Sequence, residues 1–210
     1  MLDLRRRLTA QVIRALDDGR TVVVVGGPGM GKTHLAEAVR RGRSRTVGED
    51  GVKADRLGAL SAGAPPTLLT LGVADYDAAY AARSGTLWVP LVNVIPRVFR
   101  RHFDDGDARW QASGGHPALA AQTPFPNAEQ RARLRDLVHD DPRLSETLSA
   151  IYAATASLTP SARYAHVDAA SAYPLKPCLD RLACAGLVTR MIHDARPGLW
   201  VTPFEPPLFG

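Results

Sequence analysis

Apolar residues recur in the first 42 positions with two different spacings, and each spacing predicts a different element. A helical period with arginines and aspartates between the apolar positions predicts an amphipathic helix that ends near Gly19. The apolar residues of this period are Leu4, Leu8, Val12, Ile13 and Leu16. The next stretch, TVVVV, has four consecutive valines without polar alternation, which is typical of a strand buried on both faces of a parallel sheet. A turn, GGPGMG, then leads into KTHLAEAVRRG, a predicted helix that ends at Gly42.

The middle of the chain predicts two more strands and several short helices. Residues 42–66 combine glycines, polar clusters and a double proline, so we expect mostly loop with one short helix. TLLTLGVAD (67–75) predicts a second buried strand, and TLWVPLVNV predicts a third in which Pro90 either ends the strand or confines it to an edge. IPRVFRRHFDD predicts a short amphipathic helix, and another helix is expected to start at Pro117.

The last part of the chain has a different pattern. Helices are expected around 144–152, over 159–172 and over 173–186, and LVTRMIHDARPGLWVTPF predicts a strand, a turn and a strand. Three helices and a hairpin in roughly 65 residues is the order of a winged helix-turn-helix. We therefore expect an α/β domain over 1–110, a helical segment over 111–140 and a winged-helix domain over 141–210.

One motif carries clear chemistry. Residues 26–33, here called the phosphate loop, satisfy the pattern G-x-x-x-x-G-K-[ST] directly after a predicted strand and before a predicted helix. Glycines let successive backbone N–H groups point at an oxyanion, and the helix start adds donors and a positive dipole end. Lys32 is the expected catalytic cation on the β- and γ-phosphates, and the Thr33 hydroxyl is expected to bind Mg²⁺. The expected nucleotide-binding residues are Gly26, Gly27, Pro28, Gly29, Met30, Gly31, Lys32, Thr33 and His34.

The stretch GGPGMGKTHLAEAV, with the helix before the strand, resembles P-loop ATPases of the AAA+ and STAND classes. SGGHPALAAQ is similar to the glycine-x-proline signature of STAND and archaeal-type AAA ATPases, here Gly115, His116 and Pro117. The resemblance implies a compact parallel P-loop NTPase sheet, a helical lid whose Pro117 lies against bound ATP or ADP, and a winged helix after the lid. LDRLACAGLVTRM resembles the third helix and first wing strand of that module.

The resemblance also implies a Walker B strand with an acidic pair, and three interpretations of the relevant stretch stay open. Aligned backwards from GGHP, TLLTLGVAD falls on the sensor strand of the family, and no Walker B strand remains. Alternatively, this stretch is the Walker B strand, with Asp75 as the catalytic carboxylate near Mg²⁺ and Asp77 near the attacking water. Asp75 also fits the N-cap of a following helix. Because losing a positioned base slows the chemical step by about 10²–10⁴, binding is predicted and hydrolysis is left open.

Arginines and one lysine suggest two further roles. In the family, arginines that sense the γ-phosphate lie between sheet and lid, and Arg109 is the candidate here. Arg97, Arg100 and Arg101 fit a solvated helix face equally well. Basic residues of the winged-helix segment could neutralise DNA phosphates, and among them Arg196 is the candidate base reader. These residues are Arg163, Lys176, Arg181, Arg190 and Arg196. Winged helices of this family also dock proteins, so the expected partner is DNA or a protein.

Composition adds limits. Of 26 basic residues, 23 are arginine, and the excess over 21 acidic residues permits nucleic-acid contact without requiring it. Cys178 and Cys184 are expected to be reduced thiols, and no histidine spacing predicts a metal site. No apolar run reaches the ~20 residues of a membrane span, and the N-terminus lacks a signal-peptide core. We expect a cytoplasmic protein without membrane contact, whose oligomeric state is open.

Three functions compete at this point. The first is a nucleotide-dependent regulator or ATPase of AAA+/STAND type that acts through its winged helix. The second is a hydrolysis-deficient nucleotide-binding interaction module that lacks Walker B. The third, a small-molecule kinase, is favoured only by length, because no arginine-bearing lid over the phosphates is evident and a winged helix has no role in such an enzyme.

Overall fold

The computed structural model describes residues 5–42, 65–81, 85–121, 128–155, 164–166, 178–193 and 196–201. The chain divides into two compact units. The first unit comprises Met1–Gly27 and Gly31–Leu91, and the second comprises Pro28–Met30 and Val92–Gly210. The tip of the phosphate loop therefore groups with the C-terminal part of the chain, while both ends of the loop belong to the first unit. The expected division into 1–110, 111–140 and 141–210 stays a prediction.

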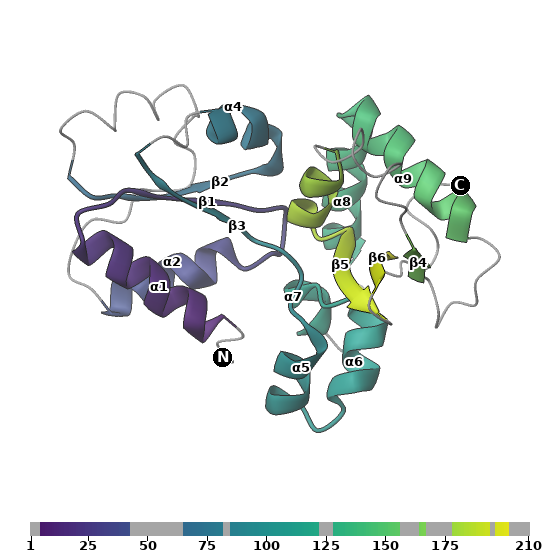
Figure 1. The fold of residues 1–210 in the computed structure, drawn as a ribbon, viewed down its shortest axis with the longest axis horizontal. Coiled ribbons are helices and arrows are strands. Elements are labelled where there is room, and N and C mark those ends of the chain that lie inside the picture. Colours follow the sequence, from purple (N-terminus) through teal and green to yellow (C-terminus); the bar gives the residue numbers. More distant parts are fainter. Residues whose placement is uncertain are drawn as a thin grey trace. The chain divides into compact units, whose positions relative to one another are not determined.

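The first unit is a small α/β structure with a three-stranded parallel sheet in the order β2-β1-β3. Helices α1 and α2 lie on one face of this sheet, and α4 lies on the other (Figure 1). Val25 at the end of β1 pairs with Leu71 of β2 on one side and with Pro90 of β3 on the other. The elements are α1 Arg6–Asp17, β1 Val22–Val25, α2 Lys32–Gly42, β2 Leu68–Leu71, the 3-10 helix η2 Val73–Asp75, α4 Tyr76–Ala81 and β3 Leu87–Pro90.

Burial in this unit follows the hydrophobic pattern. All four residues of β1 are buried, as expected for a central strand covered on both faces. In α1, Val12 and Leu16 are buried, so the predicted helical face is the one that covers the sheet. On α2, Leu35 and Val39 do the same. The predicted α/β class, with a parallel sheet and flanking helices, is confirmed for this unit.

The ends of two strands are informative. β3 is an edge strand and ends at Pro90, as the proline predicted, because proline has no N–H to donate to a further ladder. β2 is shorter than expected. It ends at Leu71, and the chain turns through Gly72 into η2. Asp75 therefore lies in the turn beyond the strand and not at the end of the strand itself.

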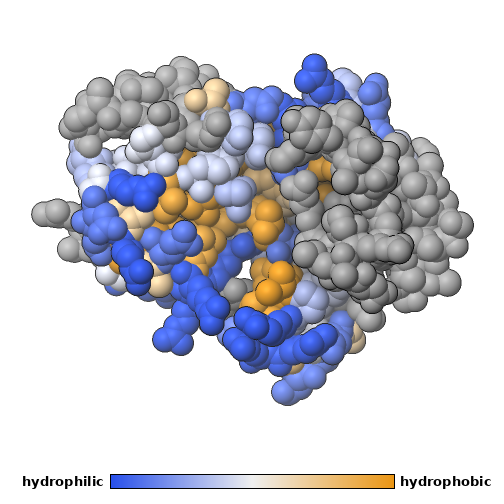
Figure 2. All heavy atoms as spheres, viewed as in Figure 1, coloured by the Kyte–Doolittle hydropathy of each residue, from blue (hydrophilic) through white to orange (hydrophobic). Residues whose placement is uncertain are grey.

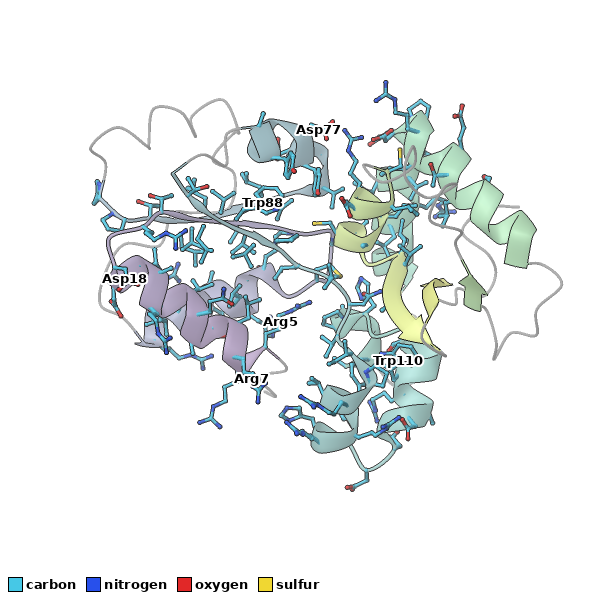
Figure 3. All side chains as sticks on the ribbon, viewed as in Figure 1. Arg5, Arg7, Asp18, Asp77, Trp88 and Trp110 are labelled. Atoms are coloured by element: carbon cyan, nitrogen blue, oxygen red, sulfur yellow. The ribbon has the colours of Figure 1, made fainter. Side chains whose placement is uncertain are left out.

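An aromatic cluster joins α4 to the sheet. The rings of Tyr76 and Tyr80 stack at 6.1 Å, and Trp88 of β3 meets them edge-on at 5.4 Å and 5.8 Å. Figure 3 shows Trp88 beneath α4, on the face of the sheet opposite α1. A helix as short as α4 is not stable alone. Edge-to-face contacts of this kind fix its packing against the sheet.

The second unit contains helices and a separate antiparallel sheet. The sheet has the strands β4 Tyr164–His166, β5 Val188–His193 and β6 Arg196–Val201 in the order β4-β6-β5. Another helix, over residues 178–185, leads through Gly186 into β5. The remaining helices are α5 Pro96–His102, α6 Gly106–Ser113, α7 Pro117–Ala120, α8 Ala128–His139 and α9 Pro142–Thr155. None of the helices in the described ranges has the length and apolar character needed to cross a bilayer.

The sequence prediction for the C-terminal part is correct in its hairpin and wrong in one helix. β5 and β6 pair antiparallel, with Val188 opposite Val201 and His193 opposite Arg196, as predicted. The helix expected over 159–172 is contradicted by β4, which pairs Tyr164 with Trp200. Backbone pairing with a strand more than 30 positions away outweighs the local helical pattern there. The other residues of that expected helix, 159–163 and 167–172, lie outside the described ranges.

The junction between α8 and α9 is held by one carboxylate. Asp141 Oδ1 accepts from the backbone N–H groups of Arg143 and Leu144, at 3.0 Å and 3.4 Å, which makes Asp141 the N-cap of α9 with Pro142 after it. Its Oδ2 pairs with Arg181 Nη1 at 2.5 Å. Asp141 therefore caps one helix and holds a residue of another.

Candidate phosphate-binding site

The phosphate loop follows the buried β1 and ends in α2, as its motif predicted. Gly26 donates its N–H to Leu71 O at 3.2 Å, so the loop begins beside the end of β2. Gly29 and Gly31 have φ of 71° and 88°, a region that side chains rarely adopt. Backbone of this kind turns successive N–H groups inward and makes a concave site for an anion. The glycines of the motif are therefore needed for the shape of the loop.

Lys32 is the first residue of α2, and its side chain turns back over the loop. Its Nζ donates to Gly26 O at 2.7 Å and to Gly27 O at 3.0 Å. The ammonium group is thus held at the mouth of the loop, where the helix dipole also favours negative charge. A phosphate oxygen entering the loop would meet one full positive charge and a set of backbone donors.

The residues after Lys32 leave polar groups accessible. Thr33 and His34 are exposed on the first turn of α2. An accessible hydroxyl at this position can act as one oxygen ligand of Mg²⁺, with phosphate oxygens and water supplying the others. Within the described residues, no group of three or more His, Cys, Asp or Glu side chains could hold a metal ion.

Asp75 lies at the same edge of the sheet as the phosphate loop. The carboxyl ends of β1 and β2 are side by side, since Val25 and Leu71 are paired. Asp75 is half-buried, and its Oδ2 lies 3.9 Å from where a Cβ of Gly72 would be, so the carboxylate turns back toward the strand end. It also directly precedes α4, the place required of an N-cap. Both interpretations of Asp75 stay open, and Asp77 is exposed on α4 (Figure 3).

The segment SGGHP has the turn and helix that its sequence predicted. Gly114 and Gly115 have φ of 60° and 82°, and α7 begins at Pro117. His116 is fully buried, whereas Pro117 is half-buried. The loop-tip residues Pro28 and Gly29 are half-buried, and Met30 is fully buried. The sequence motif gave no reason to expect burial of His116 or Met30.

Arg109, the candidate phosphate sensor, is held by other groups. Its Nε and Nη2 donate to the two carboxylate oxygens of Asp105 at 3.0 Å and 3.1 Å, and its Nη1 donates to Ala120 O at 2.9 Å. The guanidinium carbon also lies 4.7 Å from the ring centre of Phe103. The hydrogen bonds that Arg109 donates to the Asp105 carboxylate hold the pKa of Asp105 below its ordinary value. Arg109 therefore ties α6 to α7, a role that its position in the sequence did not indicate.

The other arginines of this region are solvent-facing. Arg97, Arg100 and Arg101 are exposed on α5, and Arg100 pairs with Asp107 of α6 at 2.7 Å. In Figure 2 the surface of α5 and α6 is mostly hydrophilic. This placement agrees with the solvated helix face that was one of the two interpretations.

The basic residues considered for DNA contact are only partly described. Arg181 is 16% exposed and paired with Asp141, so it stabilises the fold of its unit. Arg190 and Arg196 lie on β5 and β6, but their side chains are outside the described set. Lys176 and Arg163 lie outside the described residues altogether. A shared basic surface for DNA stays a prediction.

Two buried polar residues were not identified from the sequence. Asn93 Nδ2 donates to Gly186 O at 3.1 Å and to Thr189 Oγ1 at 2.9 Å. Thr189 Oγ1 in turn donates to Gly114 O at 2.9 Å. The only signal in the sequence is that each interrupts an apolar run, in LVNVI and LVTRMI. These side chains join the segment after β3, the SGGHP turn and the start of β5.

No family model matches this chain, and neither the curated proteins nor the solved structures contain a match. The resemblance to AAA+ and STAND ATPases therefore stays a prediction, resting on the phosphate loop and on the glycine-x-proline segment.

Proposed function

We propose that the protein binds ATP or ADP with Mg²⁺ in the phosphate loop and acts as a nucleotide-dependent regulator or ATPase. The observation that carries the proposal is the position of Lys32 Nζ over the carbonyls of Gly26 and Gly27, at the start of α2. A buried strand, two glycines with positive φ and a cation at a helix N-terminus together favour a ligand with several negative charges.

The residues present fit such a ligand. Backbone N–H groups of the loop would hold the phosphates, Lys32 would neutralise their charge, and Thr33 would bind Mg²⁺. A bound Mg²⁺ would neutralise part of the negative charge of the phosphates. Adenine as the base is supported by the resemblance alone, together with the absence of a guanine-reading N/T-K-x-D motif in the sequence.

We place the partner-binding part of this nucleotide-dependent regulator in the C-terminal part of the chain. A helix over 178–185 followed by the hairpin β5–β6 supports a winged helix-turn-helix. DNA and a protein partner are the two candidate targets. Since Arg181 is paired with Asp141, DNA contact would depend on the other basic residues of this part.

A hydrolysis-deficient binding module is the second candidate. It is favoured by the position of Asp75, which follows the end of β2 by a 3-10 turn and does not lie on the strand. A carboxylate that is not fixed near Mg²⁺ would leave binding intact and slow the chemical step.

The test is equilibrium binding of labelled ATP and ADP, with steady-state ATP turnover in Mg²⁺, for the wild type and Lys32→Ala. Losing the charge-assisted hydrogen bonds of the lysine should weaken binding about 30- to 100-fold. Arg41→Ala is the matched control, since it removes an exposed cation from the other end of α2. It should leave affinity within about twofold because it is far outside the first turn of the helix.

Each outcome has a distinct meaning. Turnover that disappears in Lys32→Ala and falls in Asp75→Asn supports an ATPase. Binding that is lost in Lys32→Ala, without turnover in any variant, supports the binding module. A wild-type protein that binds neither nucleotide contradicts the proposal.

A further inference from the structure

The tip of the phosphate loop carries a side chain that the binding of phosphate does not require. Met30 is 0% exposed, although the glycines on both sides of it are half-buried. An anion site made of backbone N–H groups needs no side chain at this position. Pro28–Met30 also group with Val92–Gly210 and not with the rest of the loop. The side chain of Met30 is therefore a packing element of the second unit.

The partner of Met30 is a glycine late in the chain. A Cβ at Gly186 would lie 2.5 Å from Met30 Sδ, 2.6 Å from His116 Cδ2 and 3.2 Å from Asn93 Oδ1. Real side chains do not approach this closely, so only glycine leaves room for the methionine here. Gly186 also has a φ of 83°, where the helix over 178–185 ends.

The backbone of Gly186 is fixed by polar contacts. Asn93 Nδ2 donates to Gly186 O at 3.1 Å and to Thr189 Oγ1 at 2.9 Å. Thr189 Oγ1 donates to Gly114 O at 2.9 Å, which ties the start of β5 to the SGGHP turn. The four groups are buried, and buried hydrogen bonds of this kind strongly specify one arrangement. Met30 thus packs against a rigid surface.

We infer that Met30 and Gly186 are positioning residues of the phosphate loop, and that nucleotide affinity is coupled to the packing around Gly186. The inference rests on the proposed function. Holding the loop in its binding conformation before the ligand arrives lowers the ordering cost of binding. Because such coupling is reciprocal, a bound nucleotide must stabilise the segment around Gly186 to the same degree.

The first experiment compares two glycines with the same backbone conformation. Gly186→Ala should weaken ADP binding about tenfold, a typical coupling between sites. Gly85→Ala is the matched control, because Gly85 has a φ of 80° and nothing lies within 4 Å of a Cβ there. Both variants carry the strain of alanine at positive φ, and only Gly186→Ala displaces Met30. Equal ADP affinity in the two variants would contradict the inference.

The second experiment does not depend on the stability of Gly186→Ala. Met30→Ala removes the side chain and should weaken ADP binding about tenfold, whereas Met30→Leu, which nearly conserves volume, should recover most of the affinity. Amide hydrogen exchange at residues 186–189 is then followed with and without ADP. Exchange should slow in the wild type when ADP binds and should respond less in Met30→Ala.

The outcomes separate this inference from the proposed function. If the wild type binds ADP and exchange at 186–189 does not change, the coupling is wrong and nucleotide binding stands. The same holds if Met30→Ala binds ADP as tightly as Met30→Leu. If the wild type binds no nucleotide, the proposed function fails and the inference fails with it.

Discussion

β1 and the segment that follows β3 are both buried, but the hydrogen bonds of their backbones are made in different ways. Val22–Val25 are apolar and buried, and ladders on both sides pair their backbone groups. Asn93 and Val94 are also buried, but they lie outside any strand. There Asn93 supplies hydrogen bonds through its side chain, and Val94 O accepts from Trp110 Nε1 at 2.8 Å.

This difference shows which kind of backbone needs polar side chains. In a sheet, the neighbouring strands pair with the N–H and C=O groups of a strand, so the side chains of that strand can all be apolar. Where buried chain is irregular, polar side chains from distant positions complete the hydrogen bonds. Adding a polar group is therefore costly in the first kind of core, and losing a polar side chain is costly in the second.

The largest effect is expected where two irregular segments touch. Gly115 N–H and C=O bond to Ser113 Oγ and Val94 N, and a Cβ at Gly115 would collide with Val94 O and lie 2.8 Å from Trp110 Nε1. Gly115→Ala should therefore lower the free energy of unfolding by at least about 3 kcal/mol. Chemical denaturation measures this change. Gly19→Ala is the control, since Gly19 has a φ of 78° and open space around it, and a loss as large in that variant would contradict the role of the close approach.

Two substitutions test this difference: one removes the polar side chain from the irregular segment, and the other adds a polar side chain to the strand. Asn93→Leu leaves Gly186 O without its Asn93 donor and should cost about 2–3 kcal/mol in the free energy of unfolding. Val24→Thr keeps the shape of the side chain in β1 but buries a hydroxyl, and should cost about 1–2 kcal/mol. Denaturant unfolding of both variants measures the two costs. A stabilising Asn93→Leu would show that the polar contacts of this segment are not needed for the fold.

The smallest effect concerns a polar contact at the surface. The pKa of Asp105 lies below its ordinary value because Arg109 donates hydrogen bonds to its carboxylate. The folded state therefore binds the proton more weakly than the unfolded state. The contribution of Asp105 to stability is full above the ordinary pKa of about 4, and it is lost as the pH falls through the lowered pKa.

The measurement is the free energy of unfolding at neutral and at acid pH for wild type and Asp105→Asn. The difference between the two proteins should shrink on acidification, and it should be small throughout because this carboxylate is exposed. A difference that grows toward acid would reverse the assigned sign.

Local periodicity explains what could be predicted. β1 and the phosphate loop are each predicted from residues that are neighbours in the sequence, namely the four valines and then the glycines and the lysine. Strand, loop and helix therefore follow from the order of side chains. Pro90 and Pro117 act equally locally, one by lacking an N–H and the other by its fixed φ.

What could not be predicted depends on long-range pairing. Asn93 and Thr189 bond across 96 positions, and nothing near either residue indicates the other. Tyr164–His166 lie in a stretch with helical spacing and become a strand only because β6 is present. Arg109 was the candidate γ-phosphate sensor, yet in the fold its guanidinium donates to Asp105 and to Ala120 O and lies over the Phe103 ring. Burial of Met30 likewise depends on a glycine 156 positions later in the chain.

The double contact of Asp141 links the start of one helix to the position of another. One of its oxygens starts α9, and the other holds Arg181, 40 positions later. The same carboxylate therefore caps α9 and fixes a residue of the helix over 178–185. A substitution at residue 141 would disturb the capping of one helix and the docking of the other together.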